Sequence, residues 1–307
     1  MAVTAAMVKE LREMTGAGMM DCKKALSNTD GDMDKAVEYL RENGMAKAAK
    51  KAGRIAAEGI VKVVTEGNKA AIVEVNSETD FVAKNADFNA YVEEVAQQAL
   101  NTKATDIDAF LAESWTKDTS KTVADVLAGQ VAIIGENLKI RRFAQVEESN
   151  GFIASYIHMG GKIGVLVDVE TDVVNSAIEE MAKNVAMQAA ALKPMYTNRS
   201  EVDPEYIAKE TEIITATAKN EKPDANDKII EGMVKGRLNK ELKEICLLDQ
   251  TYVKAEDGKQ SVSAYVAEVA KANNANITIK GFVRFETGEG IEKKNEDFAA
   301  EVAAQLQ

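Results

Sequence analysis

An internal repeat constrains the fold of this chain more strongly than any other feature of its 307 residues. Shifting the sequence by 92 residues places residues 59–100 on residues 151–192 without a gap, and ten of the 42 aligned positions are identical. Both copies show alternating apolar residues, a turn, a loop and then helical periodicity. We therefore predict a core of two related α/β subdomains, each built from a hairpin, a loop and a helix.

The loop is the best matched part of the repeat. Glu78-Thr79-Asp80-Phe81-Val82 lies over Glu170-Thr171-Asp172-Val173-Val174, and the two stretches differ at one position, Phe81 against Val173. A phenylalanine between a strand and a helix is often part of the core. The valine in the second copy indicates that the fold itself does not require an aromatic residue there. We therefore interpret Phe81 as an anchor for another protein, a role in which aromatic side chains are enriched.

Three short helices are expected before the repeat. Met7, Leu11 and Met14 recur at helical spacing, and a second helix follows from Met19 to Leu26. Asp32 is a good cap for a third helix, which Gly44 is well placed to end. The basic residues 45–54 then indicate either a solvated helical linker or a linker that also touches an acidic partner.

The remaining elements are predicted from local patterns. Residues 103–130 have a helical pattern around Trp115, and residues 138–146 have a strand pattern. Asp203-Pro204-Glu205 is a strong helix start. It opens a pair of helices with narrow apolar stripes, joined near Pro223, which we expect to project from the body. A helix over 262–272, a strand over 277–285 and an amphipathic helix over 297–306 complete the chain.

Composition argues against several kinds of site. The chain has one histidine, His158, and two distant cysteines, Cys22 and Cys246, so a zinc site built from these ligands is not expected. No phosphate-binding glycine loop is present, and the formal charge of −12 argues against a general nucleic-acid binder. The cysteines are expected to be reduced and buried, as in a cytosolic protein. We predict no catalytic, metal-binding or cofactor-binding residue.

Three stretches together carry a resemblance. They are Val8-Lys9-Glu10-Leu11-Arg12 with Thr15-Gly16-Ala17-Gly18-Met19-Met20-Asp21-Cys22-Lys23-Lys24-Ala25-Leu26, then Glu78-Thr79-Asp80-Phe81-Val82-Ala83-Lys84, then Gly281-Phe282-Val283-Arg284-Phe285-Glu286 with Gly288-Glu289-Gly290. In this order and spacing the chain resembles bacterial translation elongation factor Ts over its full length.

The resemblance implies a guanine-nucleotide exchange factor for elongation factor Tu. Such a protein binds the GDP form, displaces magnesium and GDP, and is released when GTP binds. Thr79, Asp80, Phe81 and Val82 would enter the partner beside its nucleotide site. Further contacts would come from Arg12, Met19, Met20 and His158. The resemblance implies a cytoplasmic protein that is not an enzyme, needs no cofactor, touches neither nucleic acid nor membrane, and forms a homodimer or a 2:2 complex in some members.

The expected fold class is α+β. It comprises a small three-helix (UBA-like) domain, the duplicated core, a protruding antiparallel helical hairpin and a C-terminal helix. The expected boundaries are 1–54 for the three-helix domain and linker, 55–145 for the first subdomain, 146–201 with 246–285 for the second, 202–245 for the hairpin and 286–307 for the C-terminal module.

Two other functions remain open on the sequence alone. A carboxylate-dependent enzyme would use Asp80 or Asp172 as a base in a concave pocket. A ubiquitin-like-binding or scaffold module would explain the three helices but not the duplicated core. The individual residues also have ordinary interpretations: one of Met19 and Met20 would belong to a helix core, and His158 would be a histidine in a hairpin turn.

Overall fold

The computed structural model of the protein describes residues 3–292 and shows an α+β fold. The helix predicted over 297–306 lies outside the described residues. The elements follow in the order α1 (Ala5–Thr15), α2 (Met19–Asn28), α3 (Met33–Lys51), β1 (Glu58–Glu66), β2 (Lys69–Ser77), α4 (Asp80–Ala83), α5 (Ala86–Asn101), α6 (Ile107–Ala112), β3 (Ser114–Trp115), β4 (Asp118–Thr122), α7 (Val123–Ile134), β5 (Lys139–Glu147), β6 (Gly151–His158), β7 (Ile163–Thr171), α8 (Ser176–Leu192), a 3-10 turn (Arg199–Glu201), α9 (Pro204–Glu221), α10 (Asp227–Ile245), a second 3-10 turn (Leu247–Asp249), α11 (Val262–Ala272) and β8 (Ile277–Glu286).

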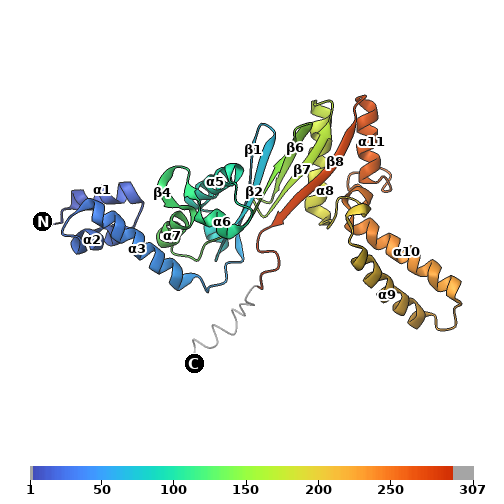
Figure 1. The fold of residues 1–307 in the computed structure, drawn as a ribbon, viewed down its shortest axis with the longest axis horizontal. Coiled ribbons are helices and arrows are strands. Elements are labelled where there is room, and N and C mark those ends of the chain that lie inside the picture. Colours follow the sequence, from blue (N-terminus) through green and yellow to red (C-terminus); the bar gives the residue numbers. More distant parts are fainter. Residues whose placement is uncertain (1–2, 293–307) are drawn as a thin grey trace.

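Two three-stranded antiparallel sheets form the body (Figure 1). The first has the strand order β1-β2-β5 and packs against α5, and the second has the order β6-β7-β8 and packs against α8. The alternation of side chains along each strand gives each sheet a second apolar face. These second faces pack on each other through Val61, Ile72, Leu166 and Phe285. The body is therefore a stack in which each sheet lies between its own helix and the other sheet.

The three N-terminal helices enclose a small core that includes Leu11, Cys22 and Leu26. Of the residues that recur at helical spacing in α1, Leu11 is buried but Met14 is exposed, and Val8 is buried instead. Both cysteines of the chain are buried free thiols, as predicted.

The third helix is longer than predicted. It does not end at Gly44 but continues to Lys51. Gly44 is buried within the helix, beside the Ala128 backbone and the Ala132 side chain of α7. Packing against α7 therefore outweighs the low helix propensity of glycine at this position.

The region around Trp115 also differs from the prediction. Instead of continuous helix, β3 and β4 form a two-stranded sheet between α6 and α7. Trp115 is buried in the first core, where its ring lies 6.5 Å from that of Tyr91. Burial of this large side chain fixes an extended segment that its polar neighbours do not indicate.

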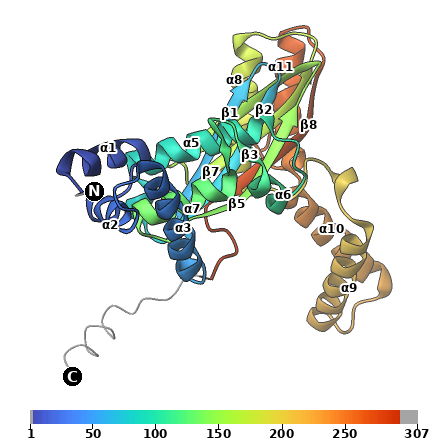
Figure 2. The same cartoon turned by 60° about the vertical axis from the view of Figure 1, so that its left-hand side comes forward.

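Two helices that pack on each other, α9 and α10, lie where the helical hairpin is expected. Asp203 accepts a hydrogen bond from the amide of Glu205, at the start of α9. A narrow stripe that includes Ile214, Ala218 and Ile230 joins α9 to α10. Figures 1 and 2 show the pair extending away from the two sheets.

The hairpin and helix of each repeat copy are present, but the gap-free alignment is wrong. Glu74 in β2 and Asp168 in β7 each precede a β-bulge, so these strands correspond at a shift of 94 residues. Asn85 caps α5 and Asn175 caps α8, which gives a shift of 90 residues for the helices. The copies therefore differ in the length of the loop that joins strand to helix.

The extra length belongs to the first copy. Ser77 and Thr171 occupy matching positions, because each donates its hydroxyl to the carbonyl oxygen two residues ahead, at 3.0 Å. Seven residues, 78–84, then precede Asn85, whereas three residues, 172–174, precede Asn175. The four additional residues match the length of α4. The helical turn that carries Phe81 thus has no counterpart in the second copy, and pairing Phe81 with Val173 was incorrect.

Candidate partner-binding site

The predicted loop forms a single turn of helix, α4. Thr79 caps it, and its hydroxyl oxygen accepts a hydrogen bond from the amide of Val82 at 3.4 Å. The amide of Lys84 closes the turn by donating to the carbonyl oxygens of Asp80 and Phe81, each at 3.2 Å. The backbone is thereby folded back on itself within a few residues.

This turn holds its aromatic side chain in solvent. Phe81 is 81% exposed, whereas Val82 is half-buried against the first core and Ala83 is buried. The core interpretation of Phe81 is therefore wrong. An exposed aromatic side chain on an anchored turn is suited to insertion into a pocket of another macromolecule.

Asp80 is held by its own turn. Its carboxylate pairs with the Lys84 ammonium at 2.6 Å. This hydrogen bond lowers the pKa of Asp80 below its ordinary value, and the positive charge of Lys162 lowers it further. The carboxylate is consequently ionised at neutral pH and is a weak base.

The second candidate base, Asp172, is in a similar state. It accepts hydrogen bonds from the backbone amide and the side-chain amide of Asn276, at 2.8 and 2.7 Å. These bonds lower the pKa of Asp172. Asp172, like Asp80, is therefore a weak base. Within residues 3–292 no group of three or more His, Cys, Asp or Glu side chains is placed to hold a metal ion.

Glu136 is a residue of this site that the sequence did not indicate. It follows α7, and its carboxylate accepts the backbone amides of Glu78 and Thr79, each at 3.0 Å. It also accepts the Thr79 hydroxyl at 2.6 Å. The next residue, Asn137, donates its own amide to the Glu78 carboxylate at 2.5 Å. The contact spans more than fifty residues of sequence, so no local pattern could reveal it.

His158 lies at the end of β6, where its Nδ1 is 2.9 Å from the Tyr156 hydroxyl. The next residue, Met159, is 72% exposed and has a positive φ of 49° in the turn. Lys162 of the same turn is the residue whose charge reaches Asp80. The turn after His158 therefore lies at the same end of the body as α4, with Met159 as its most exposed apolar side chain.

The predicted N-terminal contacts are all on the surface. Arg12 is exposed on the last turn of α1. Met19 and Met20 are both exposed, the latter by 75%, so the interpretation that one of them belongs to a helix core is wrong. The inward positions of α2 are taken by other residues, namely Cys22, Ala25 and Leu26.

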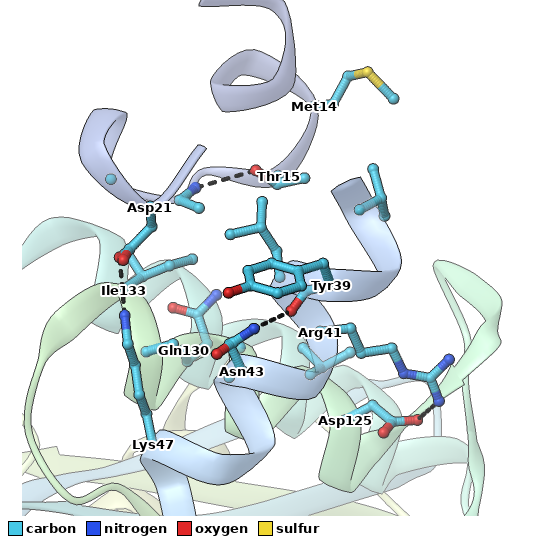
Figure 3. A pocket seen from close by; sticks show the side chains of 18 of the residues that line it. Met14, Thr15, Asp21, Tyr39, Arg41, Asn43, Lys47, Asp125, Gln130 and Ile133 are labelled. Atoms are coloured by element: carbon cyan, nitrogen blue, oxygen red, sulfur yellow. Dashed lines mark hydrogen bonds and ion pairs between the residues drawn. The ribbon is translucent and has the colours of Figure 1, made fainter. Parts of the chain in front are cut away.

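A cavity of about 410 Å³ is lined by residues of the N-terminal helices and of α7 (Figure 3). Its lining residues form two ion pairs, Arg41 of α3 with Asp125 of α7 at 2.7 Å and Lys47 of α3 with Asp21 of α2 at 2.9 Å. Its lining includes the exposed side chains of Met14 and Ile133. Four of the charged residues that line this cavity are therefore engaged in ion pairs with one another.

The third stretch that carries the resemblance, residues 281–290, has a structural role. Phe285 packs between the sheets, and the guanidinium of Arg142 lies 4.3 Å from the centre of its ring. Gly288 donates its amide to the fully buried carboxylate of Glu74 at 2.8 Å. This stretch therefore joins the two halves of the body and so supports the end that carries α4.

An aromatic side chain presented on a short anchored turn, on a rigid two-sheet body, is typical of a protein that acts by contact with a partner. The sequence model of the family described as elongation factor TS matches residues 78–289. The chain belongs to the elongation factor Ts family.

Individual relatives extend this likeness to the whole chain. Elongation factor Ts of Clostridioides difficile (strain 630) is 56% identical over 306 residues, which cover 99% of both chains. Elongation factor Ts of Clostridium botulinum (strain Eklund 17B / Type B) is 52% identical over 307 residues, again 99% of both chains. In the part of the chain that the structure describes, none of the helices is long and apolar enough to cross a membrane.

Proposed function

We propose that this protein is the guanine-nucleotide exchange factor of elongation factor Tu. It binds the GDP form, displaces magnesium and GDP, and is released when GTP binds. Membership of the elongation factor Ts family supports this assignment. The single observation that carries it is the exposure of Phe81 on α4, a turn that the second copy of the repeat lacks.

Exchange requires no covalent chemistry, and the protein is accordingly proposed to be no enzyme in the chemical sense. It must bind empty partner more tightly than GDP-loaded partner, and by linkage GDP and this protein weaken each other's binding equally. A 10⁴-fold difference corresponds to about 5.5 kcal/mol. An aromatic anchor in a pocket supplies about 2–4 kcal/mol of such a difference.

The residues of α4 have distinct proposed roles. Phe81 enters a pocket of the partner beside its nucleotide site. Asp80 brings an ionised carboxylate toward the magnesium ion and the phosphates, once its pair with Lys84 opens. Thr79 and Val82 keep the turn in place from either side, through the cap and through the core.

Other surfaces are proposed to add affinity. Arg12, Met19 and Met20 are exposed on the N-terminal helices, and His158 lies beside the exposed Met159. The projecting hairpin offers a separate surface, either for the partner or for a second copy in a homodimer or 2:2 complex. We place this activity in the cytoplasm, without direct contact to nucleic acid.

The test is release of a fluorescent GDP analogue from elongation factor Tu, followed by stopped flow. Catalytic amounts of this protein should accelerate release in proportion to their concentration, and should leave the partner able to take up GTP. An unchanged release rate at all concentrations contradicts the proposal.

A further inference from the structure

We propose that Glu136 is a positioning residue that sets the orientation in which α4 presents Phe81. This inference rests on the proposed exchange function. Glu136 does not belong to the loop, and it is half-buried in the connection between α7 and β5. Its three hydrogen bonds all go to the two residues immediately before α4, Glu78 and Thr79.

α4 needs contacts from outside because a helix of its length is not stable by itself. An isolated helix of four residues is not stable in water, since its nucleation cost is not repaid by further hydrogen bonds. Phe81 adds little burial, and the cap bond between Thr79 and the Val82 amide is long, at 3.4 Å. Packing of Val82 and Ala83 fixes one side of the turn, and the side-chain amide of Asn89 donates to the carbonyl oxygen of Ala83 at 2.9 Å. Both contacts lie at the end of the turn, after Phe81.

Glu136 fixes the start of the turn. One carboxylate oxygen accepts both successive backbone amides, of Glu78 and Thr79, so it fixes the direction of the chain as it enters α4. The other oxygen accepts the Thr79 hydroxyl at 2.6 Å, which orients the capping side chain.

Glu78 is bound to the segment of Glu136 and Asn137 in both directions. Glu78 gives its amide to Glu136 and receives the amide of Asn137 on its own carboxylate, at 2.5 Å. Asn137 is buried, and its side-chain amide donates to the carbonyl oxygen of Arg54 at 2.7 Å. The residues before α4 are therefore bound to a rigid junction between α7, β5 and the segment that leads into β1.

The second copy of the repeat provides an internal comparison. Its short connection, residues 172–174, carries no helical turn, and Asp172 is held instead by Asn276 near β8. In the second copy the carboxylate, Asp172, belongs to the loop and accepts hydrogen bonds from outside it. In the first copy the carboxylate, Glu136, lies outside the loop and accepts hydrogen bonds from it. Among residues 3–292, a carboxylate from outside the loop therefore binds the loop only in the copy that contains the extra turn, α4.

Two substitutions of Glu136 distinguish the effect of its side-chain length from the effect of its charge. Glu136→Gln keeps the length of the side chain, an oxygen that can accept both amides, and a group that can bond the Thr79 hydroxyl, but it loses the charge. Glu136→Asp keeps the charge but is one methylene too short to make all three bonds. A positioning role predicts that the Gln variant retains exchange within about threefold, whereas the Asp and Ala variants lose about tenfold or more of the maximal rate. The apparent KM for GDP-loaded partner should change less.

Glu113→Ala is the matched control. Glu113 is another half-buried carboxylate of the same half of the body, and it accepts the Thr102 hydroxyl at 2.7 Å and the Lys103 amide at 3.3 Å. It removes the same kind of bonds away from α4, so its exchange rate should stay within about twofold of the unchanged protein. Equal losses for Glu113→Ala and Glu136→Ala would mean that Glu136 acts through general stability, and would overturn the inference.

Amide hydrogen exchange of the free protein gives a readout that does not depend on activity. The amides of Glu78 and Thr79 should be protected in the unchanged protein and in Glu136→Gln, and should exchange at least tenfold faster in Glu136→Asp. If the unchanged protein did not accelerate GDP release from elongation factor Tu, the proposed function would be refuted. The amide-exchange measurement would still test the role of Glu136. Unaltered protection in Glu136→Asp, or an Asp variant more active than the Gln variant, would overturn the positioning role.

Discussion

The amide of Gly288 donates a hydrogen bond to Oε1 of Glu74 at 2.8 Å, across 214 residues of sequence. Glu74 is fully buried in the middle strand of the first sheet, and it also pairs with Arg141 and Arg142, at 3.0 and 2.6 Å. The segment after β8 is thereby fixed to the opposite sheet. The end of the body that carries α4 depends on this junction for its rigidity.

Gly288→Ala should destabilise the protein by about 3 kcal/mol or more. Gly288 has a φ of +71°, and a Cβ atom there would overlap the backbone carbonyl of Ala57. Gly290 is the control, because it has a φ of +74° but open space around its Cβ position. Gly290→Ala should cost about 1 kcal/mol, from the left-handed backbone alone. Urea unfolding of both variants measures the difference, and equal costs would contradict the close contact.

Asp168 should make stability depend on pH. Burial, with the neighbouring Glu148, raises the pKa of Asp168 to about 6. Because the folded state holds this proton more tightly than the unfolded chain, stability from this group is complete below about pH 4 and is lost as the pH rises through about 6. Asp168→Asn should therefore stabilise the protein at pH 7.5 by about 1–2 kcal/mol after allowance for solvent screening, and should have little effect at pH 4.

Thermal unfolding between pH 4 and pH 8 checks this expectation. Glu170→Gln is a suitable control, since Glu170 is exposed and is a smaller cause of the raised pKa of Asp168. A destabilised Asp168→Asn protein at pH 7.5 would show that the charged form of Asp168 is favourable in the fold.

Asp80→Asn tests the charge on the turn. The substitution keeps the shape of the side chain and should leave the folded structure unchanged, because Asp80 and Lys84 form a solvent-exposed pair. If the carboxylate acts on the magnesium site of the partner, GDP release should slow by about tenfold at saturating protein, as for loss of one charged contact. An unchanged rate would confine the role of α4 to its aromatic side chain.

Shortening the first loop to the length of the second tests whether α4 is needed for the fold. Replacing residues 78–84 with the three residues 172–174 removes the turn and leaves both flanking elements. Since the second copy folds with this short connection, the variant should keep its secondary structure by circular dichroism and unfold cooperatively. Exchange activity should be lost. A variant that cannot fold would show that the packing of Val82 and Ala83 in the first core is required for folding.

The sequence predicted those elements whose signals are local. The cap at Asp203, the helix over 262–272 and the strand over 277–285 all appear at or within one residue of the expected positions. Their capping side chains and periodic apolar residues act over a few positions, so the sequence displays them directly.

The errors arose where distant packing decides the outcome. α3 continues through Gly44 because α7 lies against it, and Trp115 becomes part of a strand because the first core takes up its ring. The gap-free repeat alignment failed because the copies differ in length twice: the hairpin turn between the strands is longer in the second copy, and the loop before the helix is longer in the first. The exposed loop could be located from the repeat, but its support by Glu136 depends on a contact that only the fold creates.

Phe81→Ala tests the central claim most directly. The rate of GDP release from elongation factor Tu should fall by about a hundredfold, which corresponds to about 2–3 kcal/mol, while the melting temperature stays unchanged because Phe81 is exposed. Val174→Ala, which removes an exposed apolar side chain from the loop of the second copy, should leave the rate within about twofold. If the Phe81→Ala variant accelerated GDP release from elongation factor Tu as much as the unchanged protein does, the account would be contradicted.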